Sequence, residues 1–250
     1  MTEQTVPTSP QTYARTGGIL YLIIIVAGLF AELLVRGKLI VSGDATATAN
    51  NITSSELLFR SSAAIEVVWL LCAVGVTLIL YVLLRPVSQN LALLAAMFNL
   101  VSIAVEAVAT GSLFAALFFL GQADYLKTLE PKQLHTLAYL CLKIYDSGFA
   151  ITLVFFACCL FVYGYLVYKS TYFPRTIGVL LVIASLSYLI NSFVLFLAPG
   201  YAGKIFPILV LAFIGESSFC LWLMVKGVDV AKWREWASAG DEGIAKQRLL

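Results

Sequence analysis

The stretch from Ser62 to Leu84, SAAIEVVWLLCAVGVTLILYVLL, contains a single charged side chain, Glu66, in an otherwise apolar run. About 20 apolar residues are enough for an α-helix to cross the hydrocarbon core of a bilayer. A carboxylate at that depth costs on the order of a few kcal/mol unless it faces protein, water or a cation. The stretch therefore predicts a membrane-spanning helix with a polar face turned away from lipid.

Five other stretches share this character, and the composition agrees with them. Of the 250 residues, 61% are hydrophobic and only 12% are charged, which lies outside the range of soluble globular domains. The sequence predicts an all-α polytopic membrane protein, a bundle of six transmembrane helices. The expected spans are Gly18–Val35, Ser62–Leu84, Leu91–Leu117, Ser147–Tyr168, Thr176–Leu197 and Phe206–Lys226.

The segments outside the spans predict three regions. Residues 1–16 form a polar N-terminal tail, residues 17–228 the six-helix domain, and residues 229–250 a cytoplasmic C-terminal tail. Trp233 and Trp236 favour an interfacial helix in part of that tail. Glu130-Pro131 fits a helix start, and the apolar stripe after it predicts a short outer helix before the fourth span, either separate from that span or running straight into it.

An even number of spans places both termini on one side of the membrane. Nine Lys and Arg side chains then fall on the terminal side and seven on the other. Because cytoplasmic loops carry the excess of Lys and Arg, we expect the N- and C-termini in the cytoplasm.

Acids within or beside the spans are the candidate functional groups: Glu32, Glu66, Glu106, Asp146 and Glu216. Helical spacing places Tyr21, Glu32 and Arg36 on one stripe of the first span, and Tyr188 and Asn191 in one sector of the fifth. We expect an outward-facing, water-accessible cavity that binds or transports a cation, a proton or a small polar solute. The residues predicted to form it are Glu32, Arg36, Arg60, Glu66, Glu106, Asn191 and Glu216.

The same residues have a structural interpretation, in which they join helices without any transport. Glu32 would then pair with Arg36, Glu66 with Arg60 or a hydroxyl group, and Glu106 with Asn191. Polar contacts of this kind stabilise membrane bundles modestly. The sequence alone favours neither the binding cavity nor the structural interpretation.

Enzyme chemistry is a third, less favoured reading. The one histidine, His135, lies in the outer amphipathic segment, so no histidine metal site or Ser/His pair is expected within the membrane. The five cysteines lie in apolar surroundings and fit buried small side chains. No metal or cofactor is expected, and the net charge of +2 does not favour nucleic acid. The lipid bilayer is the expected partner, while oligomeric partners are left open.

Several short strings resemble a known family. They are Leu20-Tyr21-Leu22, Phe30-Ala31-Glu32 with Arg36, Gly43-Asp44-Ala45, Leu58-Phe59-Arg60, Leu84-Arg85-Pro86-Val87, Tyr188-Leu189-Ile190 and Val225-Lys226-Gly227-Val228. Together they resemble the bacterial integral-membrane family called domain of unknown function 4386, over nearly the whole chain.

The resemblance implies a multi-pass protein of the bacterial cytoplasmic membrane and brings no established activity. Members often carry an acid near Cys72 and another near Asn191, and a histidine near Tyr145, all of which this chain lacks. Glu32, Arg36, Arg60 and Glu216 match the family pattern, so the resemblance favours them as a shared polar centre.

Overall fold

The computed structural model describes residues 9–247, which are helical apart from short connections. The chain begins with α1 (Pro10–Leu29), which continues through a π-helical segment, η1 (Phe30–Arg36), into α2 (Gly37–Leu39). Next come α3 (Ala45–Ser54), α4 (Glu56–Leu84), α5 (Gln89–Phe119) and the 3-10 turn η2 (Asp124–Thr128). The remaining long helices are α6 (Pro131–Lys169), α7 (Arg175–Leu197), α9 (Leu209–Val225) and α10 (Val230–Gln247).

Five of the helical stretches are long and apolar enough to cross a membrane by themselves. A sixth crossing results if the segment Pro199–Ile205, which contains the short α8 (Ala202–Ile205), counts with α9 as one span bent by 51°. The outward faces fit lipid, since Leu78 and Val108 are 61% and 80% exposed. The prediction of an all-α polytopic bundle is confirmed.

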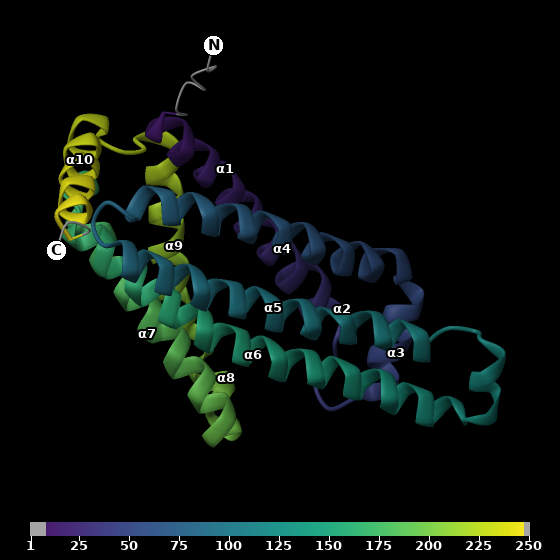
Figure 1. Ribbon diagram of the computed structural model, residues 1–250. Coiled ribbons are helices and arrows are strands. Elements are labelled where there is room, and N and C mark those ends of the chain that lie inside the picture. The colour runs from purple at the N-terminus through teal and green to yellow at the C-terminus, as the bar shows by residue number, and fades with distance from the viewer. Residues whose placement is uncertain (1–8, 248–250) are drawn as a thin grey trace, which may run out of the picture.

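Six helices, α1, α4, α5, α6, α7 and α9, close into a ring through their contacts. Figure 1 shows α4, α5 and α6 side by side. Helix α1 packs against α4 and α9, and the series α4, α5, α6, α7 and α9 continues with each helix against the next. Each long helix thus has two main neighbours, and its inward face meets the interior of the bundle.

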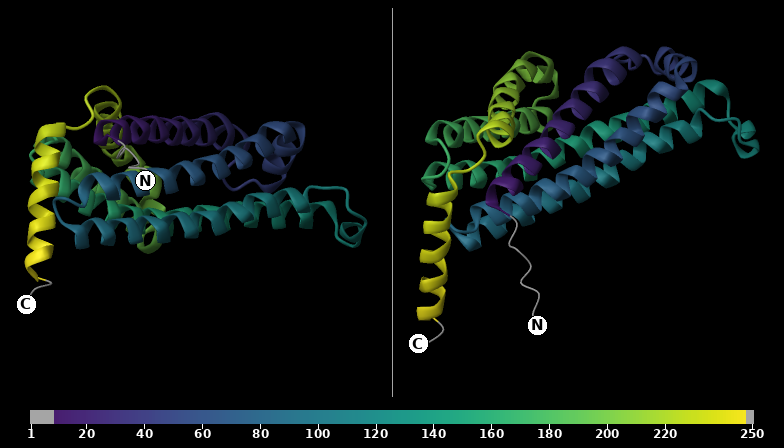
Figure 2. Two further views of the ribbon diagram at one scale, coloured as in Figure 1. Left: turned by 45° about the horizontal axis from the view of Figure 1, so that its top comes forward. Right: turned by 90° about the horizontal axis from the view of Figure 1, so that it is seen from above.

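The two ends of the bundle differ. The N-terminal end of α1 and the whole of α10 lie at one end, which we call the terminal end, and α10 lies across the bundle there (Figure 2). The side chains of Trp233 and Trp236 fix α10 in place, donating to the Leu83 carbonyl at 3.0 Å and to Thr171 Oγ1 at 2.9 Å. The opposite end, which we call the far end, carries α3 and η2.

Two details make the sequence expectation more specific. The first helix begins at Pro10, capped by the Ser9 side chain, so part of the expected polar tail is helical. The predicted short helix before the fourth span is not separate, because α6 runs unbroken from Pro131 to Lys169. The apolar stripe of its first turns is buried in one cluster with residues of α5, and this packing continues without a break into the span.

Candidate functional site

Arg36 is the centre of a buried cluster at the far end of the ring. Its Nε donates to Glu32 Oε2 at 2.9 Å, and its Nη1 donates to Glu66 Oε1. The guanidinium carbon lies 5.0 Å from the ring centroid of Tyr145, which is cation–π distance. The Arg36 and Glu66 side chains are 11% and 9% exposed, whereas that of Glu32 is 50% exposed. The cluster therefore joins α4, α6 and η1 and reaches the protein surface at Glu32.

The π-helical turn is the local feature that carries Arg36. In η1 the backbone is wound wider than in an α-helix, and such segments occur frequently at functional sites. Glu32 and Arg36 both lie within it, one near its start and one at its end. Their i,i+4 pairing, expected from the sequence, is present.

The hydroxyl of Tyr145 bridges two acids. It lies 3.0 Å from Glu66 Oε2 and 3.2 Å from Glu106 Oε1. One hydroxyl has one proton, so it can donate to only one of these carboxyl groups at a time. Glu106 is 1% exposed, and its Oε2 has no hydrogen-bond partner among the described residues; the same holds for the buried Oγ1 of Thr152. The cluster thus holds two carboxyl groups on the guanidinium and a third, Glu106, joined to them through the Tyr145 hydroxyl, with fewer donors than the carboxyl oxygens can accept.

A second buried acid lies among α1, α7 and α9. The hydroxyl of Tyr21 donates to Glu216 Oε2 at 2.7 Å, and that of Tyr188 donates to Glu216 Oε1. Both rings are held by aromatic neighbours, Tyr21 against Phe219 and Tyr188 against Phe156. Glu216 is 8% exposed and pairs with no cation among the described residues. Two tyrosine donors, one for each oxygen, take the place of a counter-ion.

The two acid clusters are separate. Tyr21 and Arg36 lie fifteen positions apart on one continuous helix, which corresponds to roughly 22 Å along its axis. Their surroundings also belong to different buried apolar clusters, one containing Tyr21 and the other Tyr145. The structure therefore divides the predicted residues between two places.

The remaining predicted residues lie elsewhere. Arg60 is exposed and pairs with Glu56 at 2.7 Å, not with Glu66. Asn191 is partly buried on α7, and the bond expected from it to Glu106 is replaced by the one from Tyr145. Asp146, half exposed, pairs with Lys143 at 3.0 Å. Of the seven residues expected to share one cavity, four form the Arg36 cluster: Glu32, Arg36, Glu66 and Glu106.

The residues that sequence reasoning did not select are tyrosines. Tyr21 and Tyr188 share helix faces with residues that were selected, so their phase on the helix was the available signal. Tyr145 gave no such signal, because only the packing of α6 against α4 and α5 shows that its hydroxyl meets both acids.

Two surface pockets lie away from both clusters. One, of about 440 Å³, is at the far end, where α3, the end of α5 and the start of α6 meet. The other, of about 230 Å³, lies between α6 and α7. Within residues 9–247 no three His, Cys, Asp or Glu side chains are grouped so as to hold a metal ion. Of the groups in the Arg36 cluster, carboxyl groups are the type that can take up a proton or coordinate a small cation, whereas the guanidinium stays charged and can only pair with the acids.

Comparison with known proteins identifies the family of this chain but no activity. An uncharacterised protein of the archaeon Archaeoglobus fulgidus is 36% identical over 154 residues, which cover 62% of this chain and 76% of the relative. No solved structure matches the chain. The family model for a domain of unknown function, DUF4386, matches residues 16–227. A match over most of the chain shows that it belongs to the DUF4386 family.

Proposed function

We propose that this membrane protein binds a proton or a small cation at the cluster of Arg36, Glu66, Tyr145 and Glu106. The observation that carries the proposal is the buried Glu106 carboxyl group: one of its oxygens accepts no hydrogen bond from the residues that the structure describes, and the other shares a single hydroxyl with Glu66. Adding a proton to Glu106 gives it a donor of its own, and adding a cation gives the free oxygen a partner.

The exposure of the side chains supports access from the far end. It decreases from 50% at Glu32 through 11% at Arg36 to 1% for the residue Glu106. The exposed Glu32 carboxylate is the surface end of the cluster and the buried Glu106 carboxyl group is its inner end, so the acids are the groups that meet an entering proton or cation, while Arg36 holds Glu32 and Glu66 in place. Uptake from the outer face, and transport across the membrane, belong to this proposal.

The second candidate function is structural. It is favoured by Glu216, both oxygens of which are satisfied across three helices, and by the contacts of Arg36 with Glu66 and Tyr145 on two other helices. Contacts of this kind join helices without requiring any ligand. We propose it as the alternative role of the whole bundle.

Replacing Glu106 by Gln separates the two roles. The amide can donate to the Tyr145 oxygen as a protonated acid would, so Glu106→Gln should fold and melt at least as high as the parent protein. The parent should show a melting temperature that depends on pH or on added cations through neutrality, and Glu106→Gln should show a flat profile.

The matched control is Glu56→Gln, which removes an exposed acid paired with Arg60. It should keep the pH and cation dependence of the parent, since exposed pairs contribute little. If Glu106→Gln retains the dependence, proton or cation binding at this cluster is refuted. If the parent protein shows no dependence at all, the structural role is the better account.

A further inference from the structure

A groove on the outer surface of the ring lies between α6 and α7, near the terminal end. It encloses about 230 Å³ and is lined by apolar and aromatic residues: Phe161, Tyr165, Tyr168, Val179, Val182 and Ile183, with Gly178 at its floor. Phe161, Tyr165 and Val179 are 44–47% exposed, so the groove opens away from the bundle interior. Its surface would meet lipid tails if the ring spans a bilayer.

Two glycines account for the shape of the groove. A Cβ atom on Gly178 would lie 2.7 Å from the Gly164 carbonyl oxygen and 2.6 Å from the Tyr168 backbone nitrogen. The backbones of α6 and α7 therefore touch at this point, as small residues allow in membrane bundles. The larger side chains on either side of this contact form the walls of the groove.

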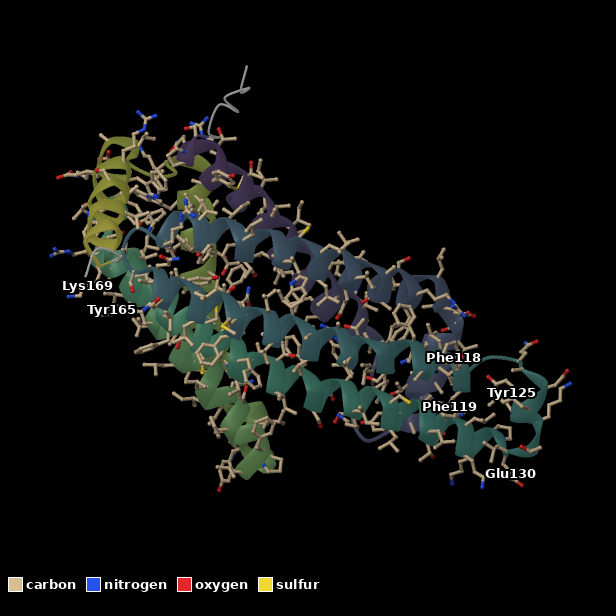
Figure 3. The ribbon with its side chains drawn as sticks, in the orientation of Figure 1. Phe118, Phe119, Tyr125, Glu130, Tyr165 and Lys169 are labelled. Atoms are coloured by element: carbon tan, nitrogen blue, oxygen red, sulfur yellow. The ribbon has the colours of Figure 1, made fainter. Side chains whose placement is uncertain are left out.

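Two cations lie at the end of the groove where α6 turns into α7. The Lys169 ammonium lies 5.8 Å from the ring centroid of Tyr165, and the Arg175 guanidinium 5.7 Å from that of Tyr168. Figure 3 shows Tyr165 and Lys169 together at this end of the molecule. Both rings line the groove, so both cations are held at its rim. Neither cation forms an ion pair with a carboxylate among the side chains that the structure describes.

This end also has the features of a membrane interface. Tyrosine and tryptophan rings gather at the level of lipid headgroups, and α10 brings Trp236 onto Thr171, within the same turn between α6 and α7. A groove for an acyl chain that ends at the interface beside two unpaired cations has the chemistry of a site for an acidic lipid.

We propose that the groove between α6 and α7 binds an anionic phospholipid. One acyl chain lies along the glycine floor, and the phosphate lies between Lys169 and Arg175. The charge of the two cations selects an acidic headgroup over a zwitterionic one, and the tyrosine rings position the cations.

The test compares two lipids on the purified full chain in detergent. Dioleoyl phosphatidylglycerol should raise the melting temperature more than dioleoyl phosphatidylcholine does, and native mass spectrometry should retain more of the acidic lipid. The double variant Lys169→Gln/Arg175→Gln should lose this difference while its melting temperature without added lipid stays close to that of the parent. The matched control, Lys132→Gln/Lys204→Gln, removes the same charge at other positions and should keep the difference.

A third variant tests the groove apart from the charge. Val179→Trp fills the groove from an exposed position and leaves both cations in place, so it should also lose the retained lipid. Equal effects of the two lipids on the parent would overturn the proposal. So would a loss in the Lys132/Lys204 control as large as in the Lys169/Arg175 variant, because net charge alone would then explain binding. Unchanged lipid retention by Val179→Trp would also overturn it, because the lipid would then bind outside the groove.

Discussion

At the scale of single residues, the hydroxyl of Tyr145 connects the two acids of the Arg36 cluster. Its ring also lies beneath the Arg36 guanidinium, so one side chain meets a cation with its face and two carboxyl groups with its hydroxyl. Replacement by phenylalanine removes only the second of these contacts. That separation makes Tyr145 a useful probe of the cluster.

We expect Tyr145→Phe to destabilise the bundle by about 1–2 kcal/mol, because Glu66 and Glu106 lose their common donor inside the membrane. The measurement is the melting temperature in detergent at neutral pH. Tyr125→Phe is the control, since Tyr125 is 68% exposed and should melt like the parent. An unchanged melting temperature for Tyr145→Phe would show that the hydroxyl contacts contribute nothing to stability.

The second acid cluster leads to a prediction about coupling. Tyr21→Phe or Tyr188→Phe leaves one oxygen of Glu216 without a donor, and each should cost about 1–2 kcal/mol. The double variant should cost more than either single change, because Glu216 then has no donor from either tyrosine. The readout is the melting temperature, with Tyr201→Phe, at an exposed position, as the control. A double variant no worse than one single variant would contradict the two-donor arrangement.

The sequence predicted which acids are buried, but it did not predict which groups those acids contact. The cost of a carboxylate in lipid predicts that Glu66, Glu106 and Glu216 face inward, and all three are buried. Which group meets each acid depends on how neighbouring helices are rotated about their axes. The periodicity of one helix says nothing about the rotation of another. Arg60 illustrates the limit: it lies six positions before Glu66, but on α4 it turns to Glu56, one helical turn away.

At the scale of elements, the glycine contact between α6 and α7 fixes how closely these helices approach. Gly178→Ala would place a Cβ atom 2.6 Å from backbone, which cannot move aside as a flexible side chain can. We expect a loss of about 1–3 kcal/mol, seen as a lower melting temperature. Gly28→Ala is the matched control, because nothing lies within 4 Å of the added Cβ, and alanine favours a helix interior. Equal melting of the two variants would contradict the close packing at Gly178.

The start of α10 depends on an aspartate outside the membrane-spanning helices. Asp229 Oδ1 accepts from the backbone N–H of Lys232 at 3.3 Å, which is an N-cap contact. This hydrogen bond, with smaller contributions from the Lys232 side chain, lowers the pKa of Asp229 below its usual value of 3.8. A carboxyl group whose pKa is lowered on folding stabilises fully above the unfolded-state value and loses its effect as pH falls through the folded value.

Hydrogen exchange at the first turn of α10 checks this contact. Protection, corrected for the intrinsic rate, should decrease as pH falls below 3.8 in the parent, and it should be low at every pH in Asp229→Ala. Asp229→Asn keeps a side-chain oxygen that can cap the helix without titrating, so its protection should not change over that range. Pronounced pH dependence in the Asn variant would assign the effect to a different group.

At the scale of helices, the length of each apolar run predicted where most of the spanning helices lie. Five of the expected spans fall within continuous helical segments, because about 20 apolar residues have few alternatives to a helix in a bilayer. The sixth, Phe206–Lys226, begins in a 3-10 turn (Phe206–Ile208) and ends one residue beyond α9. The π-helical turn at Phe30–Arg36 was not foreseen. Its sequence, FAELLVR, contains no proline or glycine that would predict a change in helical winding.

At the scale of the whole molecule, the ring places the start of α1 and the whole of α10 together and leaves α3 and η2 at the far end (Figure 2). Arg36 belongs to the far half but is buried in its ion pairs, so it does not count among the loop cations of that end. This strengthens the excess of Lys and Arg at the terminal end, so we propose that this end lies in the cytoplasm. The division into residues 1–16, 17–228 and 229–250 is part of the same proposal.

Cysteine labelling in intact cells tests this orientation. In a variant whose five native cysteines are replaced, Gln122→Cys adds a thiol at an exposed position of the far end, and Gln89→Cys adds one at the exposed first residue of α5 at the terminal end. A membrane-impermeant maleimide should label position 122 in intact cells and position 89 only after the membrane is opened. The two substitutions are chemically identical and both sites are exposed, so a difference in labelling reports the side of the membrane. The reverse pattern would place the termini outside. Equal labelling of both positions in intact cells would contradict a crossing between them, because α5 alone connects the two sites and must then fail to span.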